Sequence, residues 1–134
     1  MSEAWQKRLL FVAAAWNVLG GASAVFDPAQ HFAQMYTASL AMDEPLQLFF
    51  FRCTWINVIA WGLAYLFAAM HPGSRAPVLL AGGAGKVVYF AACFALFTSG
   101  VGKSLLLATG VFDLALAALF LFAALARPSA HVMP

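Results

Sequence analysis

The sequence predicts an all-α integral membrane protein whose single domain, residues 1–134, is an up-down bundle of four transmembrane helices with a short amphipathic interfacial helix in the first loop. Of the 134 residues, 64% are hydrophobic and only 9% are charged, whereas soluble domains carry roughly 25% charged residues. The hydrophobic residues also form long continuous segments, in contrast to the alternating pattern of a porin-like barrel. Composition and continuity together therefore favour membrane-spanning helices.

Four apolar segments have the length that a helix needs to cross the hydrocarbon core, which is about 17–25 residues. They are residues 9–26, 46–70, 77–98 and 104–126. Polar or helix-breaking residues separate them, at positions 27–28, 43–45, 71–75 and 100–103. The last two connections are short, so we expect each to join antiparallel neighbours. No Pro- or Ser-rich linker divides the chain, which predicts one domain.

The first loop is long enough to contain a helix of its own. Asp27 can cap its start, Pro28 suits the first helical position, and Gln30 completes a pattern like a capping box. Apolar residues then recur at helical spacing, namely Phe32, Met35, Tyr36 and Leu40. We therefore expect an amphipathic helix at the outer membrane interface, with His31 on its polar side. Such a helix could cover the bundle, float among the lipid head groups, or gate a substrate.

Basic residues at the ends of the spans predict the orientation. Lys7, Arg8, Arg75 and Arg127 flank one side, whereas the other side has one basic residue, Lys103. Because basic residues are concentrated in cytoplasmic loops, both termini should be cytoplasmic. The alanine-rich, short-looped chain is typical of bacteria, so the predicted location is the bacterial inner membrane.

Three ionisable side chains lie within the predicted spans, where each is costly unless it faces the bundle interior, a cavity or a partner. They are Arg52, Lys86 and Asp113, and two amides, Asn17 and Asn57, accompany them. Lys86 and Asp113 both lie near the middle of their spans, on helices joined by a short connection, so we expect them to form an ion pair. Arg52 lies nearer the outer surface, where its long side chain can reach lipid phosphate.

Small and polar residues share faces of the last three helices, which predicts a polar seam inside the bundle. Cys53 and Asn57 mark the face on the second helix, and Lys86 and Cys93 the face on the third. The two thiols should then be neighbours at similar depth. The seam could be a structural brace, a ligand, proton or ion site, or an attachment point for a partner subunit.

The sequence lacks the residues that several other functions would require. The segment 81–86 resembles a phosphate-binding loop but lacks the first glycine and the final Ser or Thr. No catalytic triad or paired carboxylates occur within the spans, the histidines fall in loops or the tail, and the cysteines lack metal-ligand spacing. The aromatic residues are too dispersed to indicate a cofactor. With a net charge of +2, the chain also lacks a nucleic-acid-binding patch. The prediction is no enzyme, metal, cofactor or nucleic acid.

Several short motifs, at residues 17–21, 27–28, 61–69, 71–72 and 82–86 and at Asp113, resemble those of small four-helix bacterial inner-membrane proteins of unassigned activity. This resemblance implies a fold and a location but no chemistry. The predicted function is that of a non-enzymatic membrane protein, either an accessory or structural subunit of a larger membrane complex or a homo-oligomeric module. Its partners would then be the lipid bilayer and other membrane subunits or itself. The alternative is binding or transport of a small anion, proton or hydrophobic molecule at an intramembrane polar site formed by Lys86 and Asp113, with Asn17, Asn57 and Arg52 nearby.

Overall fold

The computed structural model describes residues 2–125, and within this range it is all-helical. The elements are α1 (Glu3–Phe26), α2 (Pro28–Met35), α3 (Pro45–Met70), the 3₁₀ turn η1 (Pro72–Ser74), α4 (Arg75–Thr98) and α5 (Ser104–Leu125). The four long helices have the length and apolar composition needed to cross a membrane. The structure thus confirms the helical class and the four candidate spans. Arg127 and His131 lie outside the described residues.

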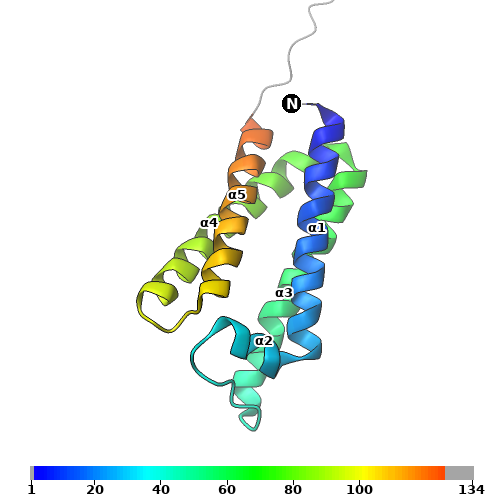
Figure 1. Ribbon diagram of the computed structural model, residues 1–134. Helices are drawn as coiled ribbons and strands as arrows, with labels where there is room; N and C mark the ends of the chain where they lie inside the picture. The colour runs from blue at the N-terminus through cyan, green and yellow to red at the C-terminus, as the bar shows by residue number, and fades with distance from the viewer. Residues whose placement is uncertain (1, 126–134) are drawn as a thin grey trace, which may run out of the picture.

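The long helices associate as two pairs (Figure 1). The N-terminal pair is α1 with α3, and the C-terminal pair is α4 with α5; each pair is in contact along most of its length. The two pairs meet at the closed end of the molecule, which holds the start of α1, η1 and the end of α5, and they separate toward the open end, which holds α2 and the α4–α5 connection. The expectation of close neighbours is confirmed for α4 and α5. The helices α3 and α4 contact each other near their short connection but make few contacts overall.

Glycines explain which helices pack together. A Cβ atom on Gly21 of α1 would lie 2.5 Å from Cγ1 of Ile59, and one on Gly62 of α3 would lie 3.1 Å from the carbonyl oxygen of Ala14. In the C-terminal pair, a Cβ on Gly110 would lie 2.9 Å from the Cβ of Cys93. Small residues that let helix backbones approach closely are typical of packed membrane-spanning helices. Glycines thus allow close contact within each of the two pairs.

The main apolar core lies at the closed end. It joins all four long helices through buried residues such as Leu10 of α1, Ala68 of α3, Leu79 of α4 and Phe120 of α5. The ring of Tyr65 packs edge-to-face on Phe120, with 5.2 Å between ring centroids. This core holds the two pairs together at one end only, which leaves space between them farther along.

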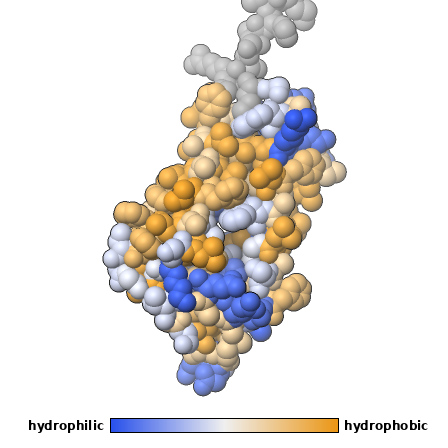
Figure 2. Space-filling model, viewed as in Figure 1, coloured by the Kyte–Doolittle hydropathy of each residue, from blue (hydrophilic) through white to orange (hydrophobic). Residues whose placement is uncertain are grey.

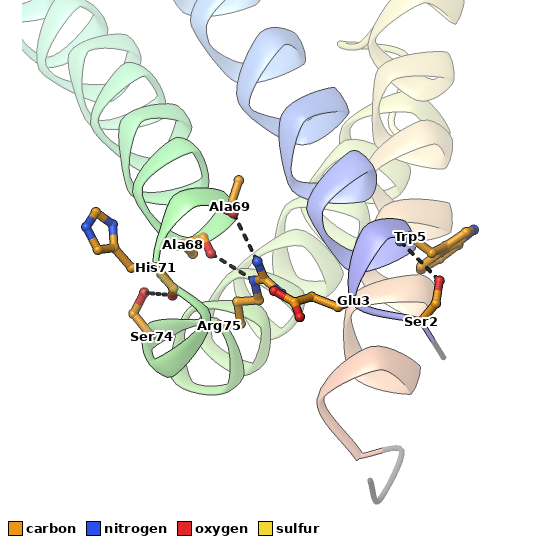
Figure 3. A network of polar contacts seen from close by, with 8 residues as sticks. All are labelled: Ser2, Glu3, Trp5, Ala68, Ala69, His71, Ser74 and Arg75. Carbon is orange, nitrogen blue, oxygen red and sulfur yellow. Dashed lines mark hydrogen bonds and ion pairs between the residues drawn. The ribbon is translucent and has the colours of Figure 1, made fainter. Parts of the chain in front are cut away.

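The Arg75 side chain stabilises the closed end because it caps the last turn of α3 (Figure 3). Its Nε donates to the carbonyl oxygen of Ala68 at 3.1 Å, and its Nη2 donates to that of Ala69 at 3.0 Å. Its Nη1 lies 3.3 Å from Oε1 of Glu3. A residue that the sequence marks only as a cytoplasmic flanking charge is therefore buried and joins α1, α3 and α4.

Arg75→Lys should lower the free energy of unfolding in detergent by about 1 kcal/mol, because an ammonium group cannot reproduce the two forked hydrogen bonds to α3. Thermal melting followed by circular dichroism would measure this loss. Glu3→Gln is the control: the Glu3 side chain is largely exposed, and exposed ion pairs contribute between about 0 and 1 kcal/mol. A larger loss for Glu3→Gln than for Arg75→Lys would contradict the capping role.

The predicted helix of the first loop is present as α2. As expected, Oδ1 of Asp27 accepts from the backbone N–H of Gln30 at 3.1 Å, and Pro28 occupies the first turn. The helix ends at Met35, so Leu40, which was expected to extend its apolar face, lies in the following loop.

Hydrogen bonds attach the C-terminal end of α2 to the α4–α5 connection. The backbone N–H of Lys103 donates to the carbonyl of Met35 at 2.8 Å, and that of Thr37 donates to the carbonyl of Val101 at 2.9 Å. The Nζ of Lys103 also donates to the carbonyl of Ala33. Since Asp27 alone separates α2 from α1, α2 bridges the two helix pairs at the open end.

The surface has the distribution of polarity that a membrane-spanning body requires. Figure 2 shows mainly apolar side chains over the long helices, with polar side chains gathered around α2 and near the start of α1. Large apolar side chains such as Leu19, Phe67 and Val88 are more than half exposed. Exposed apolar side chains gathered over long helices are typical of surfaces that contact a membrane or another protein.

Candidate ligand-binding site

The separation of the two helix pairs leaves a cavity of about 580 Å³ between them. All four long helices contribute to its walls, and α2 covers it at the open end through His31, Gln34 and Met35. The walls are mainly apolar and aromatic, with a few polar groups. Aromatic lining residues are Trp16, Trp55, Trp61, Tyr65 and Tyr89, and polar ones include Asn17, Ser23, Asn57, Lys86, Thr109 and Asp113.

Four residues form what we name the polar floor of the cavity: Asn17, Tyr65, Lys86 and Asp113. They follow directly on the closed-end core along their helices. The Lys86 ammonium lies 2.5 Å from Oδ1 of Asp113 and 3.2 Å from Oδ1 of Asn17. Lys86 is 5% exposed and Asp113 is 8% exposed. The predicted pairing of Lys86 with Asp113 is thus confirmed, and Asn17 is its third member.

Asn17 also connects the polar floor to the helix packing. Its Nδ2 donates to the carbonyl oxygen of Val58 on α3 at 3.3 Å, while its Oδ1 faces Lys86 on α4. Lys86 in turn binds Asp113 on α5. One chain of polar contacts therefore crosses from the N-terminal pair to the C-terminal pair where the pairs begin to separate.

Tyr65 contributes a hydroxyl group to the polar floor. Its ring belongs to the closed-end core and is only 2% exposed, while the residue lines the cavity. A Cβ on Gly82 would lie 2.6 Å from this hydroxyl oxygen, so the glycine leaves room for it. The Lys86 ammonium lies 5.8 Å from the centre of the tyrosine ring, which is within the range of a cation–π interaction.

His31 of α2 lies at the opposite end of the cavity from the polar floor, and the prediction that it lies on the polar side of α2 is wrong, because it shares the buried face with Pro28 and Met35. It is 7% exposed, and its ring meets Trp55 edge-to-face with 4.4 Å between centroids. The Ser23 hydroxyl donates to the carbonyl of Gly20 at 2.8 Å, so it accepts from Nδ1–H of His31 at 3.0 Å. Burial lowers the pKa of His31 below its usual value, which keeps the imidazole neutral at pH 7.

The other predicted site residues divide between the cavity and the surface. Asn57 lines the cavity, although it is exposed and belongs to no polar chain of contacts. Arg52 is exposed and is not among the lining residues; its place near the outer surface stays a prediction. The predicted interior position of both thiols is wrong for Cys53, which is exposed, whereas Cys93 is buried against α5. Cys53 is also absent from the residues that line the cavity, so it lies on a different face of α3.

Sequence reasoning missed the aromatic lining and the inward position of His31. A signal for the first is present on α3, where Trp55, Val58, Trp61 and Tyr65 recur every three or four residues and so share a helix face. This stripe does not reveal whether it faces lipid or protein, because both environments are apolar. Among residues 2–125 no cluster of three His, Cys, Asp or Glu side chains suits a metal ion.

Comparisons with known protein families, with characterised proteins and with solved structures find no match to this chain.

Proposed function

We propose that this protein binds a small, mainly apolar molecule within the bacterial inner membrane, in the cavity between its two helix pairs. The observation that carries the proposal is the cavity itself. Its volume of about 580 Å³ falls within the roughly 300–1,000 Å³ of typical small-molecule sites. Its aromatic walls and few convergent polar groups are also typical of such sites.

The polar floor supports a ligand site over a brace alone. An interhelical brace needs a charged pair with its hydrogen-bonding partners enclosed between packed helices. Here Lys86 and Asp113 are buried and hydrogen-bonded, as in a brace, but they also line the cavity. A cavity thus adjoins the side chains whose burial costs the most free energy, and this supports a role of the cavity in ligand binding.

Binding can be tested by filling the cavity. Gly20 lines it, and a Cβ added there would meet nothing within 4 Å; Gly20→Phe should therefore occupy the space without disturbing the helix packing. We expect the purified protein to bind 2-ethylnaphthalene in isothermal titration calorimetry, with empty micelles as the blank, and Gly20→Phe to abolish this binding.

Gly73→Phe provides the matched control for the cavity-filling variant. Gly73 lies in η1 at the closed end, and a Cβ there also meets nothing within 4 Å. The control should bind 2-ethylnaphthalene as the wild type does. Equal affinity of the wild type and Gly20→Phe would show that the probe binds elsewhere, and the proposed function would then be wrong.

We propose that the long helices cross the membrane in alternating directions, with the closed end in the cytoplasm and α2 on the outer side. Lys7, Arg8 and Arg75 at the closed end support this orientation. In a Cys53→Ser background, a membrane-impermeant maleimide added to intact cells should label Ser39→Cys, and it should label Gly73→Cys only after lysis. The reverse pattern would invert the orientation.

Attachment to a larger complex or assembly with a second copy stays a prediction from the sequence. It is compatible with ligand binding, because the apolar outer surface can meet either lipid or another helix.

A further inference from the structure

The charges at the polar floor cancel. The Lys86 ammonium is paired with the Asp113 carboxylate, and no other Asp, Glu, Lys or Arg among residues 2–125 lines the cavity. A ligand with a net charge would therefore bring an uncompensated charge into an apolar space. Such a charge costs several kcal/mol, so the floor is unsuited to an ion.

The polar floor nevertheless retains unused hydrogen-bonding capacity. An ammonium group has three donors, of which Lys86 directs one to Asp113 and one to Asn17. Within the described part of the chain, neither Oδ2 of Asp113 nor the hydroxyl of Tyr65 makes a hydrogen bond to protein. The Tyr65 side chain is more than nine-tenths buried, lines the cavity and packs its hydroxyl against Gly82. A donor, an acceptor and a group that can act as either thus border the same space.

On the basis of the proposed function, we infer that the polar floor binds a neutral head group that both donates and accepts hydrogen bonds, such as a hydroxyl, and rejects charged head groups. The head group donates to the free carboxylate oxygen of Asp113 and accepts from Lys86 or Tyr65. The apolar body of the ligand then lies between the aromatic walls, with its far end toward α2. The predicted ligand class is a small alcohol or phenol with a hydrophobic body that is soluble in the bilayer.

Four probes with one shared body separate this inference from the proposed function. They are naphthalene-2-methanol, its apolar isostere 2-ethylnaphthalene, the anion 2-naphthoate and the cation 2-naphthylmethylammonium. Titration calorimetry at pH 7 on the full chain in mild detergent should give about tenfold tighter binding for the alcohol than for the isostere, the equivalent of one buried hydrogen bond. Both ions should bind more weakly than the isostere.

Tyr65→Phe tests the floor with the loss of a single oxygen atom. It should weaken binding of the alcohol about threefold to tenfold relative to binding of 2-ethylnaphthalene, and a melting curve of the variant checks that it is folded. If both neutral probes bind the wild type equally, water already occupies the free hydrogen-bonding groups of the polar floor. The inference is then overturned, while the proposed function stands. Tighter binding of either ion than of the alcohol also overturns it. If neither neutral probe binds, the proposed function itself fails.

Discussion

Asp113→Asn should lower the free energy of unfolding in detergent by about 3–5 kcal/mol, the usual result of removing one partner from a buried ion pair. The Lys86 ammonium would keep its position at 5% exposure with only the Asn17 amide and a second amide as hydrogen-bonding partners. Thermal melting of the purified variant, with yield from the membrane fraction as a second readout, would measure the loss.

The double variant Lys86→Met with Asp113→Leu is the control for this result. It removes both charges together and replaces them by apolar side chains of similar size, so it should recover much of the stability lost by Asp113→Asn. An Asp113→Asn protein as stable as the wild type would contradict the pairing. A double variant less stable than the single one would show that the polar floor stabilises the fold beyond the mutual neutralisation of its charges.

Gly21→Ala should destabilise the protein by about 2–3 kcal/mol, because the added methyl group overpacks the contact between α1 and α3. It would lie 2.5 Å from Cγ1 of Ile59 and 3.0 Å from the backbone carbonyl oxygen of Trp55. Neither atom is the end of a flexible side chain, so the two helices must move apart. Melting curves in the same detergent would show the loss.

The adjacent glycine offers a matched control. A Cβ on Gly20 would meet nothing within 4 Å, and alanine is a better helix former than glycine. Gly20→Ala should therefore be neutral or slightly stabilising. Equal losses for the two variants would mean that general helix flexibility, and not the close approach of α1 to α3, explains the sensitivity of this segment.

The helices could be predicted from the sequence because each depends on local chemistry. A long apolar segment in lipid satisfies its backbone hydrogen bonds only as a helix, and Asp27 with Pro28 specifies the start of α2. The ends were less accurate: α1 begins at Glu3, before the apolar segment at residue 9, because Ser2 caps it and its first turns carry polar residues. The pairing of Lys86 with Asp113 was predictable because few other polar side chains occur at that depth.

The arrangement of the helices could not be predicted in the same way. The pairing of α1 with α3 depends on contacts such as Gly21 with Ile59, which are far apart in the sequence. The cavity exists because α3 and α4 diverge, a property of the whole packing. For the same reason the inward position of His31 was missed: α2 turns its histidine toward Ser23 and Trp55 only because its other end is hydrogen-bonded to the α4–α5 connection.

That attachment of α2 at both ends gives the helix a mechanical role. It connects the two helix pairs at the open end, and its eight residues span about 12 Å at the rise of an α-helix. The length of α2 thus sets the separation of the two helix pairs at the open end, and with it the width of the cavity. Under the proposed function, the hydrogen bonds of Met35 and Thr37 would contribute to the size selectivity of the cavity, although they lie far from the polar floor.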